Sequence, residues 1–179
     1  LVAFTSAQVI HVPGDYGSIQ EGIDAANKGD TVLVDTGTYF ENINFRGKAI
    51  TVSSHYLLNP DSVFINNTII DGGYPTYADS AAVITFCNGE DSASIICGFT
   101  ITGGMGNTIN VPALGEIVVG GGICCDQSGA KIIHNKIKNN QVSHPDVTAG
   151  GGIGANEQGD LWIIIRENSI ENNLSSGSD

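Results

Sequence analysis

The sequence predicts an all-β fold, a right-handed parallel β-helix that begins with a short N-terminal capping α-helix. Short apolar strands punctuated by glycine and asparagine run through most of the 179 residues. A glycine-rich module is repeated, since Gly120-Gly121-Gly122-Ile123 recurs as Gly150-Gly151-Gly152-Ile153. One amphipathic helical segment precedes nearly all of these strands. Together the three observations favour a solenoid of stacked coils over an ordinary β-sandwich.

The capping helix is expected over residues 18–28. Ser18 and Glu21 have the spacing of a capping box, in which each side chain bonds the backbone of the other residue. Apolar side chains then recur at helical spacing, at Ile19, Ile23 and Ala26. Gly29 is expected to end the helix in the left-handed conformation. Because the first coil of a stack exposes an apolar cross-section and unpaired strand edges, this helix is expected to cover that end. No further helix of useful length is expected.

The repeats set the expected stacking. Each module leads into a similar tail, and the tails align on Ile101, Ile137 and Ile170, which lie 36 and 33 residues apart. A strand of four or five residues cannot bury an apolar face alone, whereas coils stacked about 4.8 Å apart bury a continuous interior. Asparagines recur at the same phase and are expected at turns, with their amides stacked from coil to coil: Asn135 with Asn168, and Asn140 with Asn173. The variable stretches 105–119 and 141–149 are expected to be inserted loops.

Composition restricts the partners. The chain has 7 Lys and Arg against 19 Asp and Glu, a formal net charge of -12. This balance argues against nucleic acid and anionic membrane surfaces, because phosphates would be repelled. It is compatible with neutral glycans, or with acidic glycans bridged by a divalent cation. No apolar stretch approaches the roughly 18 residues of a membrane span, so membrane insertion is not expected.

Residues 1–7 resemble the end of a secretory signal, an apolar run followed by small residues. Residues 8–179 are then expected to form the cap and first coils of a β-helix that continues in a longer, secreted or cell-surface protein. An uncapped C-terminal end would offer a surface for self-association. The four cysteines do not have zinc-site spacing. Cys87 and Cys125 fall at similar phases, which allows either a disulfide between coils or two small buried thiols.

Several segments carry a family resemblance. Residues 12–43, VPGDYGSIQEGIDAANKGDTVLVDTGTYFENI, look like the N-terminal cap and first coil of the pectin-lyase-like superfamily. IDGG at 70–73, GFTITGG at 98–104 and the two GGGI modules resemble secreted bacterial β-helix repeat proteins of that superfamily. The resemblance implies the fold. It implies no single activity, since the superfamily includes lyases, hydrolases, esterases, tailspikes and non-catalytic surface proteins.

No catalytic residue is carried over from this family. The polygalacturonase and pectin methylesterase motifs are absent, and the segment around Trp162 does not reproduce the pectate lyase motif. A lyase needs a base and a cation that binds the uronate. The available groups are Arg46, Lys48, His134, His144, Arg166 and the lysines at 131, 136 and 138. Calcium could be held by Asp71, Asp126 or Asp160 beside glycine-rich turns, although no recognised calcium loop is present and no metal site is predicted.

Two functions follow from these observations. The first is an extracellular or cell-surface module with a structural, adhesive or glycan-binding role. The second is a polysaccharide lyase or glycoside hydrolase that acts on acidic polysaccharide, with catalytic coils mostly outside this segment. Whether the protein is an enzyme stays open. The residues expected to bind a glycan are Tyr74, Tyr77, Asp126, Trp162 and Arg166. Tyr74 and Tyr77 are the best of these, because tyrosines in a loop can stack on sugar rings.

Overall fold

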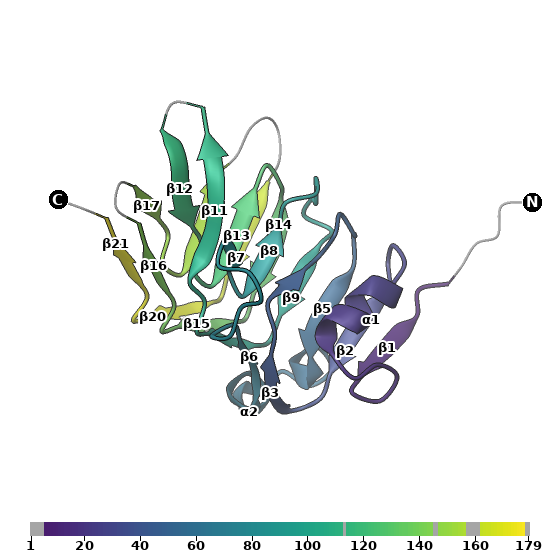
Figure 1. The fold of residues 1–179 in the computed structure, drawn as a ribbon. Helices are drawn as coiled ribbons and strands as arrows, with labels where there is room; N and C mark the ends of the chain where they lie inside the picture. The colour runs from purple at the N-terminus through teal and green to yellow at the C-terminus, as the bar shows by residue number, and fades with distance from the viewer. Residues whose placement is uncertain (1–5, 113, 145–146, 157–161, 178–179) are drawn as a thin grey trace, which may run out of the picture.

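The computed structural model describes residues 6–112, 114–144, 147–156 and 162–177. Over these residues the protein is all-β with a few short helical segments (Figure 1). Most strands pair in parallel and gather in stacked sheets. This arrangement is consistent with the predicted stack of coils, in which each strand pairs with its counterpart one coil further along.

Three sheets of parallel strands run the length of the stack in the described residues. The first contains β1 Val9–Val12, β2 Thr31–Val34, β5 Thr51–Ser54, β9 Ile95–Cys97, β14 Ala130–Ile133 and β19 Ile163–Arg166. The second contains β3 Gly37–Phe40, β6 Thr68–Asp71, β10 Thr100–Thr102, β15 Lys136–Lys138 and β20 Ser169–Glu171. The third contains β4 Ile43–Asn44, β8 Ile84–Phe86, β13 Ile123–Asp126 and β18 Ile153–Asn156.

The strand registers confirm the repeat alignment. Ile101 pairs with Ile137 across β10 and β15, and Ile137 pairs with Ile170 across β15 and β20. Ile123 of the first GGGI module pairs with Ile153 of the second. Equivalent residues therefore lie above one another, and the apolar ones form continuous columns inside the stack.

The core lies inside the three sheets. Its members are the inward residues of each strand, and most of them are fully buried. In the third sheet Ile43 and Ile123 flank Ile84. Phe45 and Phe86 are both fully buried, with ring centroids 4.3 Å apart. This burial supplies the main stabilising free energy, since an apolar side chain of this size contributes about 1.5–3 kcal/mol when fully buried.

The asparagine ladders form as predicted. The Asn135 Oδ1 accepts from the Phe99 N–H (3.0 Å), and its Nδ2 donates to the Oδ1 of Asn168 (3.2 Å). Asn140 has the same role one turn later, between Gly104 and Asn173. The left-handed residue, however, is the one before each ladder asparagine: His134, Asn139, Glu167 and Asn172. The ladder residues satisfy buried backbone groups, and their neighbours make the sharp bend.

The capping helix forms, but it is shorter than predicted. Helix α1 spans Ile19–Ala25, with Ser18 as N-cap and the reciprocal bonds of the capping box to Glu21. Ile19 and Ile23 are fully buried against the first coil, so the covering role is confirmed. The helix does not reach Gly29, because Ala26 is already extended. Instead the buried Asp30 accepts from the backbone of Asn27 (2.7 Å), which holds the chain in a turn after the helix.

Two predicted loops contain strands. Segment 105–119 forms an antiparallel hairpin of β11 Gly106–Val111 and β12 Gly115–Val119, which projects from the stack (Figure 1). The hairpin joins β7 Ser80–Ala81 on one side and β17 Thr148–Ala149 on the other. Segment 141–149 also contains β16 Gln141–Ser143, which pairs with β21 Leu174–Ser176. Ile117 and Val119 pack with Cys124 into a second small core, and this burial stabilises the hairpin.

Two short helical segments were not expected. The 3₁₀ helix η1 spans His55–Leu57 and helix α2 spans Ser62–Asn67. Both begin at side-chain caps, Ser54 for η1 and Asp61 for α2. They are too short to show an apolar period, so no helical pattern could be detected in these residues. Within the residues that the structure describes, no helix combines the length and apolar composition needed to cross a membrane.

The two ends of the stack differ. Helix α1 covers the N-terminal end, whereas the last described coil exposes inward-type residues, with Ile165 47% and Ile170 53% exposed. Self-association through this surface stays a prediction.

Neither alternative predicted for Cys87 and Cys125, a disulfide or two buried thiols, is found. Cys125 pairs in register with Phe86 and is buried, while Cys87 is one residue further along and exposed. Neighbouring strand positions face opposite sides, so the two sulfurs do not stack inside the core. All four cysteines lie in the described residues and are present as thiols. Burial raises the pKa of Cys124 to about 12, so this thiol stays protonated and unreactive at neutral pH.

Candidate functional site

A groove of about 480 Å³ lies on the outer side of β4, between helix α1 and the segment 74–80. Its floor follows the alternation of a strand. Ile43 and Phe45 point into the core, so Asn42, Asn44 and Arg46 face outward. Thr85 of the neighbouring coil extends the same surface. The floor is therefore polar although the residues between its members are fully buried.

Side-chain amides fix this floor to the surrounding chain. Asn42 Nδ2 donates to the carbonyls of Gly72 (3.2 Å) and Ala82 (3.0 Å), at the two ends of the segment that forms one wall. Asn44 Oδ1 accepts from the Arg46 N–H (2.7 Å), which holds Arg46 in a left-handed conformation with φ of 54°. These contacts bring the wall and the floor into one rigid arrangement.

The wall that carries the tyrosines is anchored at both ends. Asp71 Oδ1 accepts from the Gly73 N–H (2.9 Å) where the segment leaves β6. At its far end β7 pairs with β11, and Asn107 bonds both the Ala82 N–H (2.9 Å) and the Thr85 hydroxyl (2.8 Å). The hairpin thus supports the wall, and the segment that carries the tyrosines is fixed at both ends.

Three aromatic rings border the groove and are largely exposed. Phe40 is 63%, Tyr74 81% and Tyr77 72% exposed. Phe40 and Tyr74 meet edge to face, with ring centroids 6.0 Å apart and an interplanar angle of 70°. Leaving a large apolar side chain exposed forfeits roughly 1.5 kcal/mol or more of burial free energy. Three such rings beside one polar floor make this groove a candidate binding surface.

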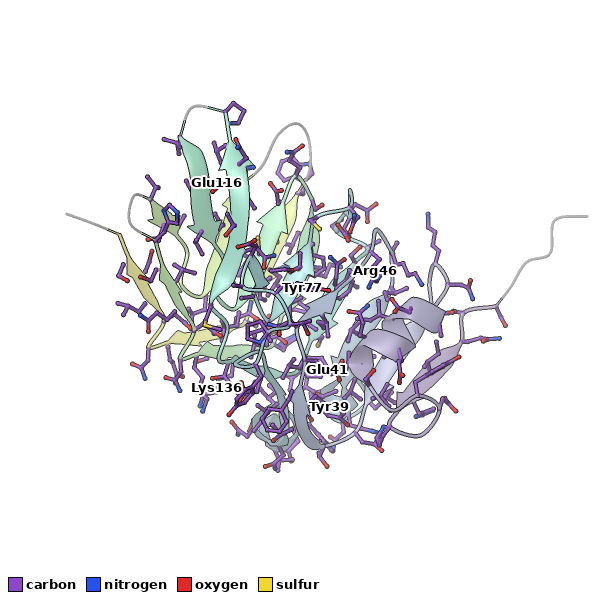
Figure 2. All side chains as sticks on the ribbon, in the orientation of Figure 1. Tyr39, Glu41, Arg46, Tyr77, Glu116 and Lys136 are labelled. Atoms are coloured by element: carbon purple, nitrogen blue, oxygen red, sulfur yellow. The ribbon has the colours of Figure 1, made fainter. Side chains whose placement is uncertain are left out.

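The opposite wall is the N-terminal turn of α1, and Glu41 holds it in place. The Glu41 carboxylate accepts from the backbone N–H groups of Ile19 and Gln20, both at 2.9 Å. The Gln20 side chain bonds the backbone of Asn44, donating to its carbonyl (3.1 Å) and accepting from its N–H (2.8 Å). Figure 2 shows Glu41 and Arg46 on the side of the groove towards α1, with Tyr77 across from them.

Arg46 is the one cation among the groove-lining residues that the structure describes. Its Nε forms an ion pair with Asp24 Oδ1 at 2.9 Å, and about half of each side chain is exposed. Lys48 lies outside the groove and instead bonds the last carbonyls of α1, those of Ile23, Asp24 and Ala26. The favourable placement of a cation at the helix C-terminus explains this lysine.

The predicted binding residues do not form one site. Tyr74 and Tyr77 line the groove. Asp126 lies on β13 and accepts from Asn156 Nδ2 at 2.7 Å. Trp162 is 74% exposed beside β19, and Arg166 is the exposed last residue of that strand. Because these three belong to later coils, the five predicted residues divide between the groove and other surfaces.

The predicted cations also serve other contacts. His134 Nδ1 lies 3.0 Å from Glu167 Oε2 and stacks on Tyr56, and Lys136 pairs with Glu171 at 3.8 Å. Among the described residues, no group of three or more His, Cys, Asp or Glu side chains converges on a metal position. Asp71 and Asp126 have the partners given above, and Asp160 lies outside the described residues.

Sequence reasoning missed Gln20, Phe40, Glu41, Asn42 and Asn44 as groove residues. The alternation of polar residues around Ile43 and Phe45 could have identified the floor, but nothing local places residues 74–80 opposite it.

Comparison with known proteins does not assign the chain to a family. No protein-family model matches the chain, and neither the curated proteins nor the solved structures contain a significant match.

Proposed function

We propose that this chain is a right-handed parallel β-helix of the pectin-lyase-like type, which acts outside the cell as a glycan-binding module. The stacked parallel sheets, the capped first coil and the asparagine ladders support the fold. The acidic composition and the resemblance of residues 12–43 to that superfamily support an extracellular role.

One observation carries the binding function: the exposed rings of Phe40, Tyr74 and Tyr77 lie beside a floor of side-chain amides. A sugar ring has an apolar C–H face and an edge of hydroxyls. The first suits a tyrosine or phenylalanine face, and the second suits amide and hydroxyl groups, which both donate and accept. A concave surface with a few fixed polar groups and aromatic walls is the usual form of a small-ligand site.

The groove supports binding better than turnover. Both Glu41 oxygens accept backbone N–H groups, and Asp24 is bonded by Arg46 and by Gln20 Nε2 (2.9 Å). A general acid or base needs a titratable group that can reach the reacting atom. Both carboxylates are instead held in fixed positions against α1 and the groove wall. The lyase or hydrolase alternative therefore depends on residues outside this groove.

A glycan array followed by calorimetry on the best glycan tests the proposal. Tyr77→Ala and Tyr74→Ala should each weaken binding about tenfold, equivalent to about 1.4 kcal/mol. Trp162→Ala is the matched control, because it removes an exposed aromatic outside the groove. All three variants should keep the wild-type melting temperature, since these rings contribute little to the core.

Two results would contradict the proposal. One is a wild-type protein that binds no glycan, and the other is binding that depends on Trp162 and not on the two tyrosines. The same glycans should be incubated with the protein while reducing ends and unsaturated uronates are followed. Turnover would promote the enzyme alternative.

A further inference from the structure

We infer that the groove selects uncharged hexopyranose chains and discriminates against chains of uronic acids. The inference rests on the proposed glycan binding and adds the class of glycan. It also runs against the composition-based option of an acidic glycan bridged by a cation.

The first step is the charge of the groove itself. Its charged lining residues are Glu41 and Arg46, and Arg46 is already paired with Asp24 at 2.9 Å. A guanidinium that shares its charge with a carboxylate attracts a second carboxylate weakly, while Glu41 and Asp24 both repel it. The three groups together carry one net negative charge. A uronate chain would therefore meet no uncompensated cation in the groove.

The second step is the hydrogen-bonding chemistry. The other polar lining groups are neutral amides and hydroxyls, which come from asparagine, glutamine, serine, threonine and tyrosine side chains, Thr85 included. Glu41 keeps acceptor capacity beyond its two backbone bonds, because each carboxylate oxygen has two lone pairs. A carboxylate acceptor suits the O–H donors of a neutral sugar and opposes the acceptor-only carboxylate of a uronate.

The third step is the field of the whole chain. The formal net charge is -12, so a polyanion approaches against long-range repulsion at low salt. Among the described residues no cluster of acidic side chains converges to hold a cation that could bridge the two negative partners. The charges in the groove and the net charge of the whole chain therefore both disfavour a uronate.

The test uses pairs of hexasaccharides that share one backbone and differ at C6 alone, as a CH₂OH or a carboxylate. Glucose, mannose and galactose backbones should each be measured by calorimetry, without divalent cations. In low salt the neutral member should bind about tenfold or more tightly, and the gap should narrow as salt is raised, because screening weakens the repulsion.

Asp24→Asn then tests the cause. Removing the partner of Arg46 should shift the uronate-to-neutral affinity ratio about three- to fivefold towards the uronate, the effect of one partly exposed charge pair. Glu116→Gln is the matched control: it removes one negative charge on the hairpin, away from Arg46 and Tyr77, and should leave the ratio unchanged (Figure 2).

The outcomes separate the two ideas. A protein that binds neither member of any pair overturns the proposed function and this inference with it. Uronate binding equal to or tighter than neutral binding, lost in Tyr77→Ala, overturns the inference and leaves the glycan-binding function intact. An unchanged affinity ratio in Asp24→Asn overturns the charge argument.

Discussion

Replacing Asn140 by alanine should destabilise the protein more than almost any other polar substitution. Asn140 is buried, 1% exposed, where the chain turns between β15 and β16. Its Oδ1 accepts from the Gly104 N–H (2.9 Å), and its Nδ2 donates to the carbonyls of Ile101 and Lys138 and to the Oδ1 of Asn173. One side chain thus satisfies polar groups on three successive coils.

The magnitude follows from these four bonds. A typical intramolecular hydrogen bond contributes about 0.5–1.5 kcal/mol net, and a buried donor left without a partner costs about 1–3 kcal/mol. In the variant the Gly104 N–H is left buried without a partner, while the carbonyls relax only in part. The expected loss of unfolding free energy is about 4 kcal/mol. For a domain of this size each kcal/mol lowers the melting temperature by about 2–4 °C. The melting temperature should fall by about 10 °C.

Urea unfolding followed by circular dichroism measures the difference. Asn139→Gly is the matched control, because Asn139 is the exposed neighbouring asparagine at a φ of 55° and glycine adopts that conformation without strain. The control should stay within about 0.5 kcal/mol of wild type. If the unfolding free energy of Asn140→Ala also stayed within about 0.5 kcal/mol of wild type, the ladder would not be a source of stability and the reasoning would be refuted.

Two further predictions concern the first coil. Ser18→Ala should lower the free energy of unfolding by about 1 kcal/mol, because the N-cap is lost. Ile23→Asp should lower it considerably more, because it places a charge against the core. An unchanged melting temperature in Ile23→Asp would contradict the capping role of α1. Backbone hydrogen bonds from Gln8, then Asn27, lower the pKa of Asp30 below 3.8, so its stabilisation is present above about pH 4 and is lost as pH falls through the lowered pKa. Asp30→Asn should therefore be less stable at pH 7 and lose less stability between pH 5 and pH 2 in thermal melts, and a parallel loss in both proteins would contradict this.

The cap and the stacking were predictable because their causes are local or periodic. The Ser18 and Glu21 capping box needs no information beyond four residues of sequence. The repeated modules and their tails predicted the pairing of Ile101 with Ile137 and of Ile137 with Ile170, because equivalent residues of successive coils bury the same face. The end of α1 was missed because it depends on Asp30, which bonds Asn27 just after the helix, and on Lys48, which bonds the last carbonyls of the helix.

What the sequence by itself determined is the capped start of the stack, the register of the repeated modules and the buried columns within them, since a period and an alternation are properties of the chain. Tertiary structure alone decided the groove. Phe40 is the last residue of β3, Tyr77 lies in the segment between β6 and β7, and the hairpin that supports this segment comes later in the chain. Their meeting depends on long-range contacts such as Asn42 with Ala82 and Asn107 with Thr85. Such contacts depend on where each inserted segment folds back onto the stack, and no local pattern of residues predicts that position.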